Sequence, residues 1–333
     1  MKIYSQTPHS SHENYLDNII SIAKLSEEFG YTGILVTYSS SSMDPLMISQ
    51  ELIKHTSSLR PLIAVPPSAL PSETLVKMLQ TSYMLSGRVI DINVINGVAN
   101  RLSEPPNPNH HNKYDPLVEY IHQVKRTISE GESLNWDFFK YTQEDQSVSK
   151  SLGHKDKYEP SVYLSGTSVP GLEASFMAKV DYLTVPQPIE RYKSEMAGYR
   201  NNEDNQLGIC LGIISRPSRE EAIAEAYRIF PQQEKERVML AFKRGSKMSG
   251  IKQMAELALE NDLFDNIYWT GPFKSTGIMY PYFIGSYEEV AAYIQQYVDF
   301  GVRTLILNIP FTKAEFVHRD EVFKRLSVSI STY

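Results

Sequence analysis

The stretch VYLSGTSVPGLEASFMAKVDYLTV, residues 162–185, has the pattern of a strand, a short polar turn, a helix and a second strand. Strand-length apolar runs that alternate with helical segments are typical of parallel βα units. Working outward from this stretch, we find the same alternation along most of the chain. Eight segments have the length and apolar character of strands, namely 2–6, 33–37, 62–66, 89–95, 161–164, 182–185, 208–214 and 304–308.

Segments with helical spacing separate these runs. Tyr15, Ile19, Ile22 and Leu25 recur at helical spacing, and Gly30 follows, where it suits a left-handed C-terminal cap. Further helices are predicted at about 44–57, 71–86, 113–130, 169–179, 188–199, 218–230 and 286–300. Eight strands that are each followed by a helix close into a barrel, so we predict an α/β chain with a (β/α)8 TIM-barrel fold. The alternative is a doubly wound open sheet.

Two segments interrupt this pattern, and we interpret them as insertions into a single domain that spans residues 1–333. The first, 131–160, is polar, and the second, 234–285, ends in YWTGPFKSTGIMYPYFIG. Glycine hinges and aromatic side chains in the second predict an active-site lid at 261–285, unless the aromatic residues pack permanently on the barrel rim. The residues concerned are Trp269, Gly271, Phe273, Gly277, Tyr280, Tyr282, Phe283 and Gly285, and Lys274 there either meets an anionic ligand or is solvated.

Composition argues against several classes of partner. The 333 residues carry a formal net charge of −6, which gives no basic field for nucleic acid or an anionic membrane. Cys210 is the single cysteine, so we predict neither a disulfide framework nor a cysteine-based metal site, and a reducing, cytoplasmic location. No apolar run reaches the roughly 18 to 20 residues of a membrane helix, and residues 1–14 lack a signal-peptide core. We therefore expect a soluble protein.

The polar turn SGTS, residues 165–168, follows the fifth predicted strand and precedes a helix. In a (β/α)8 barrel, chemistry is located at the carboxyl ends of the strands. Free backbone N–H groups and hydroxyls at the start of a helix favour an anion, and a phosphate is the obvious candidate. The alternative is that Ser and Thr only cap the helix.

Five segments, taken in order, carry a resemblance to a known family. They are LSEEFGYTGILV at 25–36, the segment 61–99 with SGRVIDINVING at 86–97, NKYDPLVEY at 112–120, YLSGTS at 163–168 and GVRTLILNIP at 301–310. This order resembles the bacterial luciferase-like family of flavin-dependent oxidoreductases, most closely its alkanesulfonate and long-chain alkane monooxygenase branch. The resemblance spans nearly the whole chain and implies a barrel with a flavin site.

The resemblance implies which residues would hold flavin mononucleotide (FMN). Its phosphate would lie at Ser165, Gly166, Thr167 and Ser168, with Tyr114 approaching it. A further set would lie beside the flavin ring, namely the polar Asn93 and Asn96 at the end of strand four and the apolar Ala64 and Val65 at the end of strand three. Small apolar residues also fill barrel layers, so Ala64 and Val65 have an ordinary packing alternative. A buried Asn93 without a partner would be costly, which favours a polar role.

The resemblance also implies the chemistry. A separate NAD(P)H:flavin reductase would supply reduced FMN, which would react with O2 to give a C4a-peroxyflavin that oxygenates a small organic substrate. Members of the family commonly form dimers or tetramers, so a homodimer or homotetramer is expected. Two alternatives stay open, since the same fold supports hydride transfer that depends on the deazaflavin F420, and a relative can bind flavin without catalysis.

Three positions depart from the sulfonate branch. Ser42 stands where that branch has a cysteine, Cys210 where it has an arginine, and Gly212 where it has a histidine. Without the arginine and the histidine, the cationic side chains that would bind a sulfonate are missing, so an alkanesulfonate substrate is not expected. The run YSSSSMD at 38–44 instead offers hydroxyls to a neutral ligand or a peroxy group, unless it is only a flexible loop.

Histidines are the remaining candidates for proton transfer. His9 follows the first strand and can act as an acid or base near neutral pH. Together with Ser42 of the YSSSSMD run, His9 is our predicted catalytic residue. His110 and His111 are weaker candidates because NPNHHN has the composition of an exposed loop. None of these histidines has metal-ligand spacing backed by carboxylates, and no metal is predicted.

Overall fold

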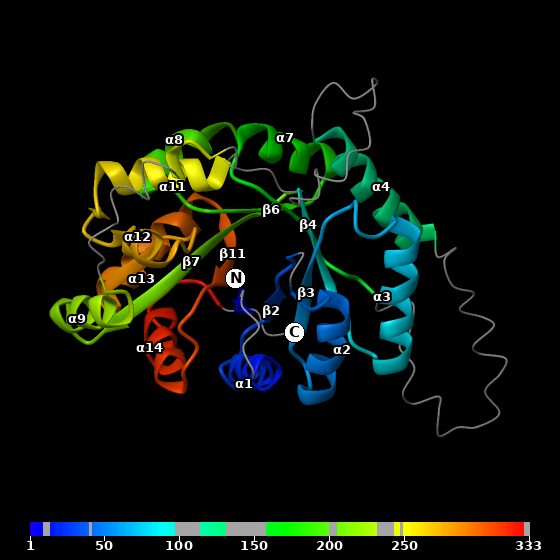
Figure 1. Cartoon of the computed structure of the whole chain (residues 1–333), viewed down its shortest axis with the longest axis horizontal. Coiled ribbons are helices and arrows are strands. Elements are labelled where there is room, and N and C mark those ends of the chain that lie inside the picture. Colours follow the sequence, from blue (N-terminus) through cyan, green and yellow to red (C-terminus); the bar gives the residue numbers. More distant parts are fainter. Residues whose placement is uncertain are drawn as a thin grey trace.

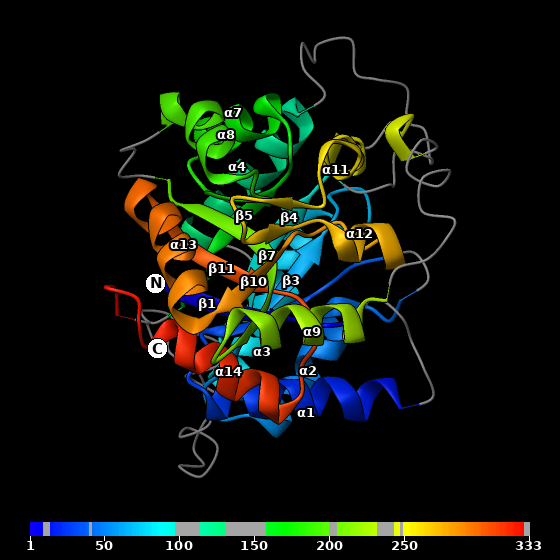
Figure 2. The same ribbon diagram turned by 90° about the vertical axis from the view of Figure 1, so that its left-hand side faces the viewer.

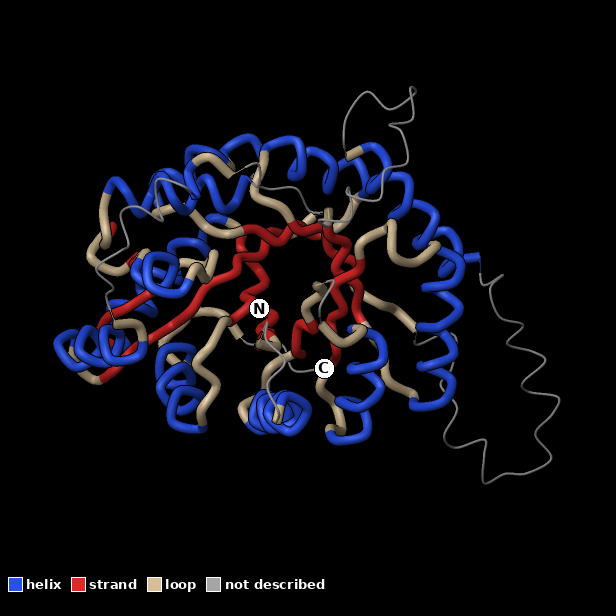
Figure 3. Tube along the Cα trace, viewed as in Figure 1, coloured by secondary structure: helices blue, strands red, loops and turns tan. Residues whose placement is uncertain are grey.

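The computed structural model describes residues 1–8, 14–39, 42–96, 114–130, 158–199, 205–231, 243–246 and 249–329. Within these residues, parallel strands form a closed ring surrounded by helices (Figure 3). In ring order the strands are β1 (Lys2–Gln6), β2 (Gly33–Val36), β3 (Arg60–Val65), β4 (Asp91–Ile95), β5 (Val162–Ser165), β6 (Asp181–Thr184), β7 (Leu207–Arg216) and β11 (Val302–Leu307). Because β11 pairs with both β1 and β7, the predicted barrel is confirmed and the open-sheet alternative is wrong.

Helices cover the outside of this ring (Figure 1). They are α1 (Tyr15–Glu28), α2 (Pro45–His55), α3 (Ser72–Ser86), α4 (Asp115–Glu130), α7 (Val169–Ala178), α8 (Ile189–Glu195), α9 (Arg219–Ile229), α13 (Tyr287–Phe300) and α14 (Lys313–Phe323). Several begin at side chains that accept a backbone N–H of the first turn, as Ser286 does from Glu289 in a complete capping box. No helix in the described part of the chain is both long and apolar enough to span a bilayer.

The predicted helices are present, but α14 was not predicted. It follows the eighth barrel strand, whereas the helix that we predicted at 286–300 precedes that strand. The apolar pattern of α14 is weak because its buried face includes Glu315 and Arg319. Glu315 forms an ion pair with Arg216, and Arg319 donates a hydrogen bond to the carbonyl of Asn308.

The described part of the segment between α9 and α13 adds a small sheet and further helices. The second half of β7 pairs with β10 (Tyr282–Ser286), which pairs with β9 (Tyr268–Trp269) and through it with β8 (Leu263–Phe264). The helices are α11 (Ser249–Glu260) and α12 (Gly271–Thr276), which lie at one end of the barrel (Figure 2). We did not predict these short strands, and only residues 158–160 of the other predicted insertion are described.

Four of the five aromatic residues that we assigned to a lid are fully buried. Trp269 and Tyr282 pack between β7, β10 and α9, and Phe273 and Phe283 lie in the core between the barrel and its helices. In this structure these four side chains belong to the core, and a lid at 261–285 stays a prediction. The fifth, Tyr280, packs against side chains inside the barrel.

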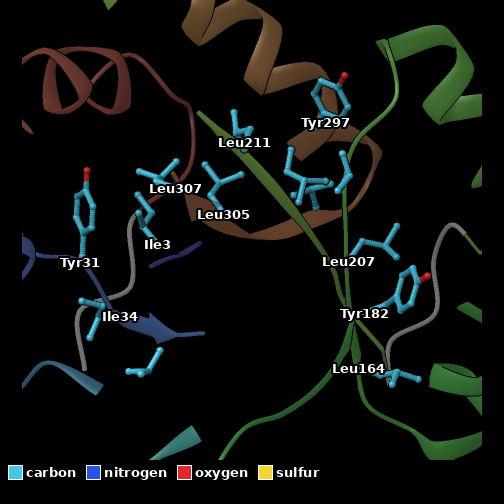
Figure 4. Close-up of a cluster of buried hydrophobic side chains, with 14 of the residues drawn as sticks. Ile3, Tyr31, Ile34, Leu164, Tyr182, Leu207, Leu211, Tyr297, Leu305 and Leu307 are labelled. Atoms are coloured by element: carbon cyan, nitrogen blue, oxygen red, sulfur yellow. The ribbon is translucent and has the colours of Figure 1, made fainter. Parts of the chain in front are cut away.

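Alternation along the strands separates two layers of core. On β11, Leu305 and Leu307 point outward to the helices, and Figure 4 shows them among the buried side chains of that outer layer. Ile306 between them points into the barrel. Burying an apolar side chain of this size contributes about 1.5–3 kcal/mol, so both layers stabilise the ring.

Charged side chains fill the amino-terminal end of the barrel interior. The carboxylate of Asp91 is fully buried and pairs with Arg60. Tyr4 donates to Asp91 at 3.2 Å, and Lys2 donates to Tyr163 at 3.3 Å. Burial raises the pKa of Asp91, and Arg60 opposes this effect. This network closes the end of the barrel opposite to the predicted site.

Candidate functional site

The carboxyl ends of the parallel strands lie together at one end of the ring, which we call the barrel mouth. Below it, an inner cluster of uncharged side chains fills the barrel: Tyr4, Leu35, Leu62, Ala64, Tyr163, Leu183, Cys210 and Ile306, with Tyr38, Ile95 and Tyr280 packed against them. Polar side chains of Gln6 and Asn93 are buried on the same strands, at 2% and 3% exposure. The barrel interior below the mouth is therefore largely apolar with a few buried polar groups, a composition that small-molecule sites commonly have.

The SGTS turn lies at this mouth and starts α7. Ser168 is the N-cap, and its Oγ accepts a hydrogen bond from the N–H of Gly171 at 3.3 Å. Among the described residues, no acceptor lies opposite the backbone N–H groups of Thr167, Ser168 and Val169. These free donors and the positive end of the helix dipole together favour an anion.

The three hydroxyls of the turn are each held by a residue from another element. Ser165 donates to Oδ1 of Asn93 at 2.7 Å, so the buried Asn93 has a polar partner within the protein, and its role beside a flavin stays a prediction. The Ser168 hydroxyl is hydrogen-bonded to that of Tyr114 at 2.6 Å, and the Thr167 hydroxyl to that of Ser249 at 2.8 Å. The structure thus brings Asn93, Tyr114 and the turn together.

Sequence reasoning missed Ser249, which begins α11 and lies 82 positions from Thr167. The neighbouring Gly250 is also close, because a Cβ there would fall 3.2 Å from Cγ2 of Thr167. No local pattern in the sequence connects these two helix starts. The contact between Thr167 and Ser249 forms only when the predicted insertion, 234–285, is folded.

Two glycines let neighbouring side chains approach the backbone of the turn. A Cβ on Gly166 would lie 2.8 Å from the hydroxyl of Tyr182, and one on Gly171 would lie 3.2 Å from the ring of Tyr114. Tyr182 donates to the carbonyl of Ser168 at 3.3 Å, and burial raises the pKa of Tyr182, which keeps it a donor. This compact turn of free N–H groups and hydroxyls suits a phosphate.

The four residues predicted to lie beside a flavin ring differ in orientation. Ala64 belongs to the inner cluster, and Asn93 is buried beside it on β4. Val65 belongs to the outer layer, so its side chain points away from the barrel interior. Asn96 is exposed just beyond β4. Ala64 and Asn93 therefore face an interior ligand, while Val65 offers such a ligand only its backbone.

The predicted catalytic residues have different outcomes. His9 lies outside the described residues, as do His110 and His111. The Ser42 hydroxyl accepts from the N–H of Ser39 and donates to the carbonyl of Ser39, both at 3.0 Å. It therefore closes its own turn.

The structure also defines the surroundings of Lys274 and of the other two positions that depart from the sulfonate branch, Cys210 and Gly212. Lys274 pairs with Asp262. Burial raises the pKa of the Cys210 thiol to about 12, so it is neutral at physiological pH. A Cβ at Gly212 would fall 2.2 Å from Cε1 of Tyr282, so there is no room for a side chain at this position. Neither Cys210 nor Gly212 supplies a cation to the mouth.

A family model described as "Luciferase-like monooxygenase" matches residues 2–304. The chain belongs to the luciferase-like monooxygenase family. Monooxygenase is the enzyme class that the sequence resemblance implied, and both the family model and the relative below carry it. This luciferase-like chain is 31% identical over 333 residues to the 4-(gamma-L-glutamylamino)butanoyl-[BtrI acyl-carrier protein] monooxygenase BtrO of Niallia circulans, and the match covers 98% of this chain and 97% of that protein.

Solved structures share the fold of this luciferase-like chain. The oxygenating constituent of 3,6-diketocamphane monooxygenase from Pseudomonas putida, in complex with FMN, matches with a TM-score of 0.66 and 14% identity, covering 99% of this chain and 100% of that one. An F420-dependent secondary alcohol dehydrogenase matches with a TM-score of 0.61 and 13% identity, covering 98% and 99%. At these identities the likeness shows the barrel fold alone.

Proposed function

We propose that this chain is the oxygenating component of a two-component monooxygenase. It would receive reduced FMN from a separate NAD(P)H:flavin reductase and use O2 to oxygenate a small organic substrate. The observation that carries the proposal is the SGTS turn, whose free N–H groups at Thr167, Ser168 and Val169 lie beside three anchored hydroxyls. Such a turn supplies both the charge and the donors that a phosphate monoester requires.

The residues at the mouth fit the rest of the cofactor. The phosphate would contact residues 165–168 and the hydroxyl of Tyr114, and the ring would lie over Ala64 with the Asn93 amide at its edge. When bound, reduced FMN supplies the electrons with which O2 is activated. The role of the protein is to orient the flavin and to keep water away from it. The apolar inner cluster is suited to the second task.

The proposed substrate class is suggested by the relative that matches nearly the whole chain. That protein is named for an acyl group carried on an acyl-carrier protein. The identity of 31% over nearly both whole chains supports the proposal that this enzyme also acts on a carrier-bound acyl chain. Neutral Cys210 and the absence of a side chain at Gly212 also favour an uncharged acyl group over a sulfonate. We further propose a homodimer or homotetramer in the cytoplasm, as is common in the family.

The phosphate site can be tested by adding negative charge to it. Ser165→Asp combined with Thr167→Asp would place two carboxylates where the phosphate binds. We expect the affinity for reduced FMN to fall by about 100-fold or more, measured by anaerobic titration. The matched control is Thr81→Asp with Ser194→Asp, which adds the same charge at exposed positions of α3 and α8. An unchanged affinity in the first variant, with normal circular dichroism, would refute the site.

A further inference from the structure

The two halves of the barrel mouth are formed by different strands. Strands β3, β4 and β5 are neighbours in the ring and carry Ala64, Asn93 and Ser165, the half assigned to the flavin. Strands β7, β11 and β1 are neighbours on the other side and carry Cys210, Ile306 and Gln6. A substrate that reacts at the flavin ring must occupy this second half.

Tyr280 is a partly buried residue that packs against the second half of the barrel interior. It lies between α12 and β10, and its ring packs against the inner cluster that contains Cys210. Burial raises the pKa of the Tyr280 phenol, the nearby Cys210 adds to this effect, and hydrogen bonding with the Gln6 side chain opposes it. The phenol therefore stays protonated, and the Gln6 side chain, 2% exposed at the end of β1, is buried in the same half of the barrel.

The described groups in this half carry no charge. The buried charges inside the barrel, Lys2, Arg60 and Asp91, lie at its amino-terminal end. An ionised substrate group at the level of Gln6 and Tyr280 would lose its hydration without gaining a counterion. A neutral group with hydrogen-bond donors or acceptors would replace its water contacts with contacts to an amide and a phenol.

We propose that Gln6 and Tyr280 are specificity-determining residues that hold a neutral hydrogen-bonding group of the substrate, such as a carboxamide, above Cys210. This inference rests on the proposed function for its assignment of the flavin half. The Gln6 amide both donates and accepts, and the Tyr280 hydroxyl does the same, so together they match a carboxamide. A carboxylate or sulfonate at this position would find no counterion among the described residues, so the cost of burying its charge disfavours it.

The single cysteine of the chain reports on this pocket directly. Iodoacetamide and iodoacetate alkylate a thiolate in the same way and are nearly equal in size, but one carries a carboxamide and the other a carboxylate. The rate constants for both reagents at Cys210 are measured by mass spectrometry on the flavin-free protein. Their ratio is divided by the ratio for the unfolded chain, which removes intrinsic reactivity and the thiol pKa.

We expect the corrected ratio in the folded protein to favour iodoacetamide by about tenfold or more. Gln6→Leu and Tyr280→Phe each remove polar groups while keeping the side-chain volume similar. Each should slow the iodoacetamide reaction by about threefold to tenfold, the effect of one lost hydrogen bond, and leave the iodoacetate reaction slow. Tyr199→Phe is the matched control, since Tyr199 stacks on Phe176 away from the inner cluster, and it should change neither rate.

The outcomes that overturn the proposal are distinct from those that test flavin binding. A corrected ratio near one, or rates that do not change in either Gln6→Leu or Tyr280→Phe, would show that these residues only pack. If Cys210 does not react in the wild type, Tyr280→Ala should open access to it, and a thiol that stays unreactive there would overturn the assignment of Tyr280. None of these reactions needs flavin, so the inference and the proposed function can fail separately.

Discussion

Tyr282 lies directly over Gly212. The two residues are register partners on the parallel strands β10 and β7, and a Cβ at Gly212 would fall 2.2 Å from the Tyr282 ring. The Tyr282 hydroxyl donates to the carbonyl of Ile309, 2.8 Å away, just beyond β11. The ring therefore links β10 with the end of the barrel strand β11, and it occupies the space that a side chain at position 212 would need.

Gly212→Ala should destabilise the fold. The methyl group has to displace the fully buried Tyr282, so we expect the free energy of unfolding to fall by about 1–3 kcal/mol in urea titrations. Gly198→Ala is the control, because no atom lies within 4 Å of a Cβ at that position. Equal stability of Gly212→Ala and the wild type would contradict the packing described for Tyr282.

Tyr114→Phe should weaken the binding of reduced FMN. The change removes the hydroxyl that lies 2.6 Å from Oγ of Ser168, and we expect a threefold to tenfold loss of affinity, roughly the effect of one hydrogen bond. Tyr120→Phe on the same helix is the control, since its hydroxyl bonds to the carbonyl of Leu70. The account would be wrong here if both variants bound flavin equally well in an anaerobic fluorescence titration.

Gly166→Ala should weaken flavin binding through a clash with Tyr182. The new Cβ would lie 2.8 Å from the Tyr182 hydroxyl, so the turn has to shift, and we expect about a tenfold loss of affinity. Tyr182→Phe removes the clashing oxygen, so the double variant should bind more tightly than Gly166→Ala alone. Additive losses in the two variants would show that the clash is not the cause.

Glu225 should contribute stability that depends on pH. Hydrogen bonding to Arg228, with a further contribution from Arg216, lowers the pKa of Glu225 from 4.5 to about 2. A lowered pKa stabilises the folded state above pH 4.5, and the contribution is lost as the pH falls toward 2. Glu225→Gln should therefore cost about 1–2 kcal/mol at neutral pH and little near pH 2.

The control for this pH dependence is Glu28→Gln. It removes an ion pair with Lys313 in which both side chains are more than half exposed, and such pairs contribute little. Urea unfolding across the acid range compares the two variants with the wild type. A constant difference between Glu225→Gln and the wild type at every pH would rule out the ionisation of Glu225 as the source.

Much of the fold could be predicted from the sequence because each barrel strand is a short apolar run. All eight were located, with ends shifted by one or two residues, since composition does not show where pairing stops. The apolar runs alone did not show which side chains face the barrel interior. Ala64 and Val65 are adjacent on β3, so strand alternation allows only one of them to face the interior.

Other features depend on contacts between distant segments. The short strands β8 and β9 have two residues each, too few for any periodicity to appear. The hydrogen bond between Thr167 and Ser249 and the packing of Tyr280 against the inner cluster arise only when the insertion folds back on the barrel. The SGTS turn could be recognised because its four residues are consecutive in the sequence. Its hydrogen-bond partners are distant in the sequence, so they could not be recognised in the same way.

The most direct test of the central claim is an anaerobic titration of the purified protein with FMN, reduced FMN and F420, followed by admission of 18O2 to the reduced complex with an acyl-carrier substrate. The account predicts preferential binding of reduced FMN and transfer of one 18O atom to the product. Preferential binding of F420, with no isotope in the product, would contradict it and assign the protein to hydride transfer.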